Sequence, residues 1–154
     1  MISNKTIARI AAIQILYQYG LSSKEQNPEE LVQKMIDFYN DQETKEELEI
    51  KSIDRNKKIK PSKTHLTQLV KLTTTNIIDI DKIIVLHLVS EEKINAIPRL
   101  VLAMLRVSIC ELKFFPETPY KVVINEFTDI ASEMITENEV GFINSLLDNV
   151  AKGR

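Results

Sequence analysis

Apolar residues recur along most of the chain at intervals of three and four, the spacing that places side chains on one face of an α-helix. In residues 119–152, two such patterns flank the polar residues Thr136 to Asn138. Pro119 suits the first helical position, where its missing N–H is not needed, and Thr118 can cap that helix. This stretch therefore predicts two amphipathic helices joined by a short turn. Their apolar positions are Val122, Val123, Phe127, Ile130, Ala131, Met134, Val140, Ile143, Leu146, Leu147 and Val150.

The same spacing predicts further helices upstream, with boundaries marked by capping residues, prolines and a glycine. Ser3 or Asn4 can cap the first, which ends at Gly20, and Asn27 can cap the second. No stretch convincingly favours a β-strand. We therefore expect an all-α single domain over residues 1–154 with six or seven helices. The expected upstream ranges are about 4–19, 28–40, 62–75, 76–89 and 99–114, with a short segment opening at Ser90.

Residues 41–60 interrupt the helical pattern with opposite charges. Residues 41–50 contain five acids and one lysine, whereas residues 51–60 contain five bases and one aspartate. We expect an exposed charged insertion, including at most a short helical piece, within the N-terminal helices of about 3–75. The C-terminal helices then occupy about 76–152. The basic half could contact RNA, but a self-neutralising solvated insertion is the simpler interpretation.

Composition and charge narrow the possible functions. The chain has 154 residues, 44% of them hydrophobic, and a net charge of −2. This charge gives no general attraction to nucleic acid, so RNA affinity must come from a local patch. Lys5 and Arg9 lie four apart near a helix N-terminus, where a phosphate could bind; a solvated basic face is the alternative. The absence of a secretory signal, of a second cysteine beside Cys110 and of a membrane-length apolar run predicts a cytoplasmic protein.

Residues with catalytic or metal-binding chemistry are few and scattered. His65 and His87 are not paired by spacing, so a satisfied or exposed histidine is expected at each. Cys110 follows apolar Ile109 and is expected in the core. No phosphate-binding glycine loop is present, so we expect neither an enzyme nor a cofactor.

Several polar residues interrupt the apolar helical faces. Arg106 lies between two apolar residues, which indicates an ion pair with Glu126 or Glu111, or contact with an RNA phosphate. Asn125 and Asn144 either satisfy buried polar groups or helix ends, or they recognise a partner.

Three ordered blocks of sequence carry a resemblance to a known family. They are ARIAAIQILYQYGLS at 8–22, LRVSICEL at 105–112, and ETPYKVVINE at 117–126 followed by GFINSLLDNVA at 141–151. Together they resemble the signatures of the bacterial NusB family (N-utilisation substance B). The resemblance covers the first helix and most of the chain from residue 100 onwards.

The resemblance implies an all-helical fold of two packed helical subdomains and a non-enzymatic role in transcription antitermination. Members of the family bind the boxA element of RNA, notably in ribosomal RNA operon transcripts. They act with NusE, a small-subunit ribosomal protein, and join other Nus factors on RNA polymerase. Some members form a homodimer, which is left open here. A related domain is fused to ribosomal RNA methyltransferases, but no methyl-transfer site is found in this sequence.

The resemblance also assigns roles to individual residues. The chain departs from the family pattern in two places: Thr6 and Ile7 stand where arginines are common, and Val101 stands where an acid is usual. If that acid contacts NusE in the family, either a hydrophobic patch at this position or a compensating change in the partner follows. A protein-only helical interaction module with weakened RNA binding is therefore the alternative function. The implied RNA-binding residues are Lys5, Arg9, Gln14, Tyr17, Arg106, Tyr120, Lys121 and Phe142, and the implied partner-binding residues are Val101, Glu111 and Asn144.

Overall fold

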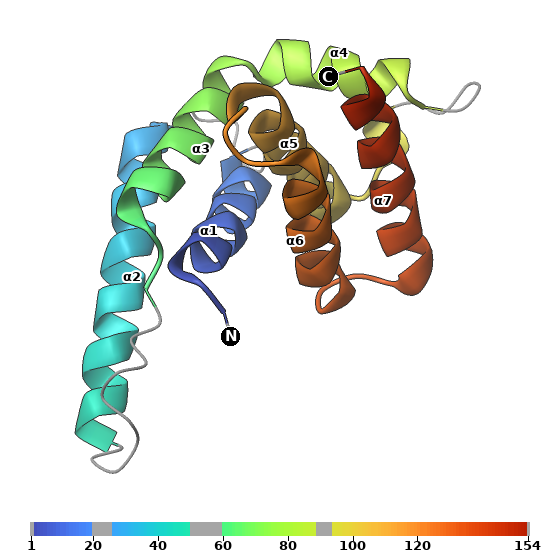
Figure 1. The fold of residues 1–154 in the computed structure, drawn as a ribbon. Helices are drawn as coiled ribbons and strands as arrows, with labels where there is room; N and C mark the ends of the chain where they lie inside the picture. Colours follow the sequence, from blue (N-terminus) through green and yellow to red (C-terminus); the bar gives the residue numbers. More distant parts are fainter. Residues whose placement is uncertain (1, 20–25, 50–59, 89–93, 154) are drawn as a thin grey trace.

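The structure of the chain is a computed structural model that describes residues 2–19, 26–49, 60–88 and 94–153, with the backbone alone for 42–49. In these ranges it contains seven α-helices, a short 3-10 helix and no strand, which confirms the predicted all-α fold. The elements (Figure 1) are α1 (Asn4–Tyr19), α2 (Pro28–Glu49), α3 (Lys63–Thr75), α4 (Ile77–Leu86), η1 (Ile94–Ala96), α5 (Arg99–Phe114), α6 (Tyr120–Ser132) and α7 (Glu137–Lys152).

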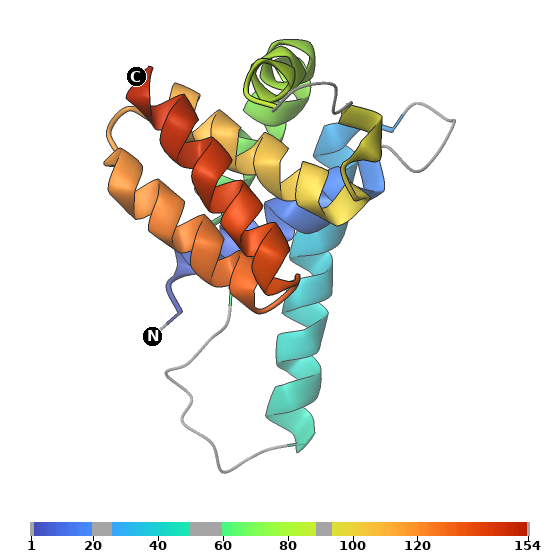
Figure 2. The ribbon, with the colours of Figure 1, turned by 90° about the vertical axis from the view of Figure 1, so that its right-hand side faces the viewer.

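Helix α5 is the central element of the fold. It packs against α1, α3, α4, α6 and α7, and its contact with α1 is the most extensive between any two helices. Helices α6 and α7 form a hairpin beside it, as both ribbon views show (Figures 1 and 2). Ten of its sixteen residues are buried, so α5 lies inside a shared core. Because that core also joins α1 to α5, the division into two subdomains remains a prediction.

Helix α2 is longer than the sequence pattern indicates. It continues to Glu49 instead of ending near residue 40, so residues 41–49 of the expected insertion are helical. Most of these residues are Glu, Gln, Lys or Leu, which are good helix formers, and the apolar pattern alone could not reveal this extension. The far end of α2 extends away from the other helices (Figure 2). Residues 50–59 and the proposed cap Ser90 lie outside the described residues.

Two helix starts differ by a residue or two from the prediction. Pro119 is the N-cap of α6 and not its first residue, because its backbone is extended and its carbonyl accepts from the N–H of Val122 and Val123. Thr118 therefore does not cap this helix. Thr136 caps α7 and exchanges hydrogen bonds with Glu139, so the helix already includes part of the expected polar turn.

Other predicted caps are found in place. The Ser3 hydroxyl accepts from the Thr6 N–H, and Oδ1 of Asn27 accepts from the Glu29 N–H. Ser62, which was not predicted as a cap, also caps α3, because its hydroxyl accepts from the His65 N–H. Most predicted apolar positions of α6 and α7 are buried or partly buried, but Val122 and Met134 are 45% and 37% exposed. Val122 is in the first turn of α6, whereas Met134 lies in the turn beyond the end of that helix at Ser132. Among the described helices, none combines the length and apolar content needed to cross a bilayer.

Candidate nucleic-acid interface

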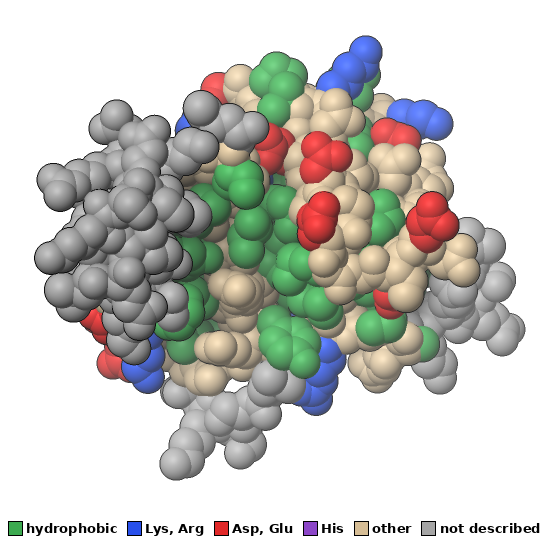
Figure 3. All heavy atoms as spheres, turned by 90° about the horizontal axis from the view of Figure 1, so that it is seen from below, with side chains coloured by type: hydrophobic (Ala, Val, Ile, Leu, Met, Phe, Trp, Pro, Cys, Tyr) green, Lys and Arg blue, Asp and Glu red, His purple; other side chains and the backbone are tan. Residues whose placement is uncertain are grey.

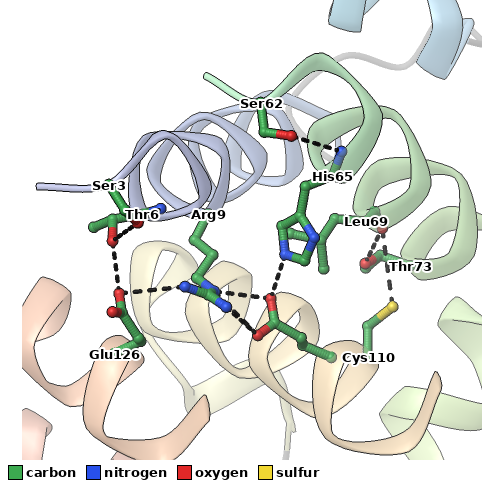
Figure 4. A network of polar contacts seen from close by, with 10 residues as sticks. Ser3, Thr6, Arg9, Ser62, His65, Leu69, Thr73, Cys110 and Glu126 are labelled. Carbon is green, nitrogen blue, oxygen red and sulfur yellow. Dashed lines mark hydrogen bonds and ion pairs between the residues drawn. The ribbon is translucent and has the colours of Figure 1, made fainter. Parts of the chain in front are cut away.

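Arg9 points into the molecule and not towards solvent. Only 3% of the residue is exposed, and its Nε donates to both carboxylate oxygens of Glu111 at 2.9 and 3.0 Å. Its Nη2 lies 2.9 Å from Oε2 of Glu111, and its Nη1 lies 3.4 Å from Oε2 of Glu126 (Figure 4). The expectation that Lys5 and Arg9 share an open basic face is therefore wrong. Position 9 faces α5, whereas Lys5 is exposed.

Four helices contribute side chains to this cluster, which we call the Arg9 cluster: Thr6, Arg9, His65, Glu111 and Glu126 (Figure 4, where Glu111 is drawn without a label). His65 is buried, with its Nε2 2.9 Å from Oε1 of Glu111. The Thr6 hydroxyl donates to Oε2 of Glu126 at 2.9 Å. The cluster therefore joins α1, α3, α5 and α6 through polar contacts.

The electrostatics of the Arg9 cluster centre on Glu111. Burial alone would raise the pKa of this carboxyl, but hydrogen bonds from His65 and Arg9 and the nearby Arg9 charge outweigh it, so its pKa lies below the ordinary value. The residue is 0% exposed. The assignment of Glu111 to partner binding is therefore wrong, because it has no accessible surface.

Val101 and Cys110 also belong to the interior. Val101 is 1% exposed, so the expected hydrophobic patch at this position is wrong: the valine packs in the core on the inner face of α5. Cys110 is buried as predicted, and burial raises the pKa of its thiol to about 12. A thiol with that pKa stays protonated and unreactive at neutral pH.

Arg106 forms an ion pair, but with a different partner from those expected. Its Nε and Nη2 each donate to one carboxylate oxygen of Asp81 on α4, both at 2.9 Å. Neither Glu126 nor Glu111 is involved. The available signal was Asp81 itself, an acid that directly follows a buried isoleucine in an apolar helix. The side chain of Arg106 is 18% exposed, so part of it remains accessible.

The remaining predicted site residues are accessible. Tyr17 and Tyr120 are 40% and 43% exposed, and Lys5, Lys121 and Asn144 are also exposed. Gln14 and Phe142 are partly buried. The explanation that Asn125 and Asn144 satisfy buried groups is wrong, because both residues are exposed.

Acidic side chains gather over the α6 and α7 side of the face seen in Figure 3, next to a central hydrophobic band, and few basic side chains are visible there. The exposed acids of these two helices include Asp129 and Glu137. Such a face would repel phosphate, so this side of the molecule suits a protein partner better than RNA.

Tyr17 and Arg106 line the same hollow, which has a volume of about 410 Å³. It lies between the C-terminal end of α1, α4, η1 and the start of α5, and its other polar side chains are Asp81, Asn95 and Arg99. The sequence pattern did not indicate Asn95 and Arg99 as site residues. In the described part of the chain, no three His, Cys, Asp or Glu side chains are arranged to hold a metal ion.

Comparison with known proteins gives one consistent family. The NusB family profile matches residues 6–152. "Transcription antitermination protein NusB" of Rickettsia rickettsii (strain Sheila Smith) is 45% identical over 151 residues, covering 98% of this chain and 93% of that protein. The protein of the same name from Rickettsia bellii (strain OSU 85-389) is 44% identical over 150 residues, covering 97% and 91%.

Solved structures agree with this assignment. The structure described as T. maritima NusB aligns with a TM-score of 0.72 at 25% identity, covering 99% of this chain and 93% of that one. The fold is also similar to a chain in a crystal structure of antitermination factors NusB and NusE in complex with dsRNA. That alignment has a TM-score of 0.76 at 23% identity and covers 100% of both chains. The profile match and the identity over nearly the whole length establish that this chain belongs to the NusB family.

Proposed function

We propose that this protein is a non-enzymatic transcription antitermination factor that binds boxA RNA of ribosomal RNA operon transcripts together with NusE. The observation that carries the proposal is the family match over residues 6–152, with relatives named transcription antitermination proteins at about 45% identity. Other Nus factors and RNA polymerase are the further partners that follow from this role. A structural neighbour that was solved with NusE and dsRNA supports the two direct partners.

Binding of RNA would depend on local contacts, since the net charge is −2. The exposed cations Lys5 and Lys121 can neutralise phosphates, and the exposed rings of Tyr17 and Tyr120 can stack on unpaired bases. Gln14 lies between Lys5 and Tyr17 on α1 and can donate to or accept from a base edge. Arg9 has a different role in this proposal: it fixes α1 against α5 and thereby positions these residues.

The contact with NusE would lie on the hairpin of α6 and α7. Asn144 is exposed and Phe142 is partly exposed, so both can reach a protein surface. The acidic side chains seen from below disfavour RNA at the end of the hairpin where α6 runs into α7 (Figure 3), which is the end of α6 opposite to Tyr120 and Lys121. A homodimer that hides the RNA surface is a separate proposal, tested by the mass of the free protein in solution.

One observation favours the second candidate, a protein-only interaction module with weakened RNA binding. The family-implied basic start of α1 is reduced by burial of Arg9, which leaves Lys5 as the exposed lysine or arginine side chain among the described residues 2–19. In this case the protein would bind NusE without any preference for boxA RNA.

Fluorescence anisotropy with a short boxA-type RNA and a scrambled control, with and without NusE, distinguishes the two candidates. The antitermination role predicts a boxA preference that NusE strengthens. A complex with NusE that shows no RNA preference would support the protein-only module and contradict the first proposal.

A further inference from the structure

The hollow of about 410 Å³ beside the C-terminal end of α1 has the features of a binding site for one nucleotide. Tyr17 contributes an aromatic ring that is 40% exposed, and apolar side chains of α1, η1 and α5 surround it. Any of the bases can stack on such a ring, because every base has a flat π-face.

The charges in the hollow favour a phosphate. Its charged side chains are Asp81, Arg99 and Arg106, which give a net charge of +1. Arg99 is exposed, and no described residue forms an ion pair with it. The guanidinium group of Arg99 is therefore available to pair with the phosphate of a nucleotide in the hollow.

Arg106 offers further donors in a fixed position. Asp81 accepts from its Nε and Nη2, which holds the plane of the guanidinium group. Five N–H groups are present on a guanidinium, and the two on Nη1 take no part in this contact. The ion pair with Asp81 and a contact with RNA are therefore compatible, and the two explanations of Arg106 do not exclude each other.

The hollow is separate from the other exposed cation of the helix. Lys5 lies twelve residues before Tyr17 on α1, which corresponds to roughly 18 Å at the rise of an α-helix. One phosphate cannot reach both positions. An RNA strand that runs along α1 would contact Lys5 and the hollow through different nucleotides.

We propose that this hollow holds one unpaired nucleotide of the bound RNA, with its base on the ring of Tyr17 and its phosphate at Arg99 and Nη1 of Arg106. The inference rests on the proposed RNA-binding function and adds to it a single-nucleotide pocket, with Asn95 and Arg99 as contact residues. Asn95 is exposed at the rim and can bind a base edge through its amide.

A set of boxA-type RNAs, each lacking one base, tests the pocket with the full-length protein and NusE. For wild-type protein, one abasic position should bind roughly 5- to 100-fold more weakly, the size expected for one lost stacking contact. The Tyr17→Leu variant should bind the intact RNA more weakly than wild-type protein does, by a similar factor. For this variant, removal of that same base should have little further effect on affinity, because the substitution and the base removal abolish the same stacking contact.

Arg99→Gln tests the phosphate contact independently. Loss of one phosphate contact should lower the log–log salt slope of RNA binding by about 0.7. Phe38→Leu on α2 and Lys152→Gln on α7 are the matched controls, because both residues are exposed and lie outside the hollow. Both controls should bind RNA as wild type does, and urea denaturation should show unchanged midpoints for all four variants.

Three outcomes would contradict the inference in distinguishable ways. Wild-type protein without any boxA preference would overturn both the proposed function and the pocket. Wild-type binding with no abasic position coupled to Tyr17 would overturn the pocket alone. Variants that lose NusE binding while RNA binding by the free protein is unchanged would show that the hollow receives the protein partner instead.

Discussion

At the scale of single residues, burial separates family-implied positions that otherwise look alike. Lys5 and Arg9 lie one helical turn apart, yet one is exposed and the other is 3% exposed. Arg9 can be buried because Glu111 on α5 forms an ion pair with its guanidinium group. A buried charge needs such a paired and hydrogen-bonded counter-charge. A cation at position 9 therefore stabilises the fold instead of meeting solvent.

Glu111→Gln should destabilise the protein by about 3–5 kcal/mol, the cost of leaving a buried charge without its counter-ion. Urea denaturation at neutral pH measures the change. Glu117→Gln is the control, because Glu117 is exposed in the loop before α6, and a change within about 0.5 kcal/mol is expected there. Equal midpoints for the two variants would mean that the Arg9 cluster contributes little to stability.

The lowered pKa of Glu111 also predicts a dependence of stability on pH. In the unfolded chain this carboxyl takes up a proton near its ordinary pKa of 4.5, whereas the folded protein takes it up only at lower pH. The stabilisation is thus complete above the ordinary pKa and is lost as pH falls through the folded value. The gap in unfolding free energy between wild type and Glu111→Gln should stay constant near neutral pH and should narrow as the pH falls below the ordinary pKa of 4.5 towards the lower folded pKa. A constant gap over that range would contradict the linkage.

At the scale of helices, the start of α7 shows how local sequence sets an element boundary. The Thr136 hydroxyl accepts from the Glu139 N–H at 3.3 Å, and Oε1 of Glu139 accepts from the Thr136 N–H at 3.1 Å. This reciprocal capping satisfies two backbone donors that would otherwise be unpaired. Position 136 thus decides where the turn of the α6–α7 hairpin ends.

Thr136→Ala should lower the free energy of unfolding by about 1 kcal/mol, the usual cost of losing a side-chain cap. Ser145→Ala is the control, since Ser145 is exposed inside the same helix and alanine is a better helix former. Chemical denaturation of both variants is the measurement. An effect of Ser145→Ala as large as that of Thr136→Ala would argue against a specific capping contribution.

At the scale of the whole molecule, the charges are unevenly arranged around a net value of −2. Acidic side chains gather on the α6 and α7 side (Figure 3), whereas the exposed cation Lys5 lies at the start of α1. A polyanion would be repelled from the acidic region, so bound RNA should avoid that part of the surface. Binding of RNA by such a protein depends on a small number of phosphate contacts.

Lys5→Gln should reduce the salt slope of boxA RNA binding by about 0.7 and weaken binding at moderate salt, while the urea midpoint stays unchanged. Arg9→Gln should behave in the opposite way, with a large loss of stability and an unchanged salt slope, because its side chain is buried and paired. Anisotropy titrations between low and moderate salt measure both. A lower slope in Arg9→Gln, measured where the protein is fully folded, would return Arg9 to the RNA contact surface.

Much of the architecture was determined by the sequence itself. The three-and-four spacing of apolar residues and the capping residues are local signals, so the helices and most of their boundaries followed from them. The family resemblance came from the three sequence blocks at 8–22, 105–112 and 117–151. The exceptions have local explanations: α2 continues through residues with good helix propensity but no apolar stripe, and Pro119 lies just outside its helix.

Only the tertiary structure decided which polar residues face solvent. Arg9 and Glu111 are 102 positions apart in the chain, and Asp81 and Arg106 are 25 apart. Whether a charged side chain is buried depends on which helix packs over it and whether that helix brings a counter-charge, and neighbouring residues carry no information about either. The same reason explains Val101, which resembled an interface residue until the packing of α5 placed it in the core.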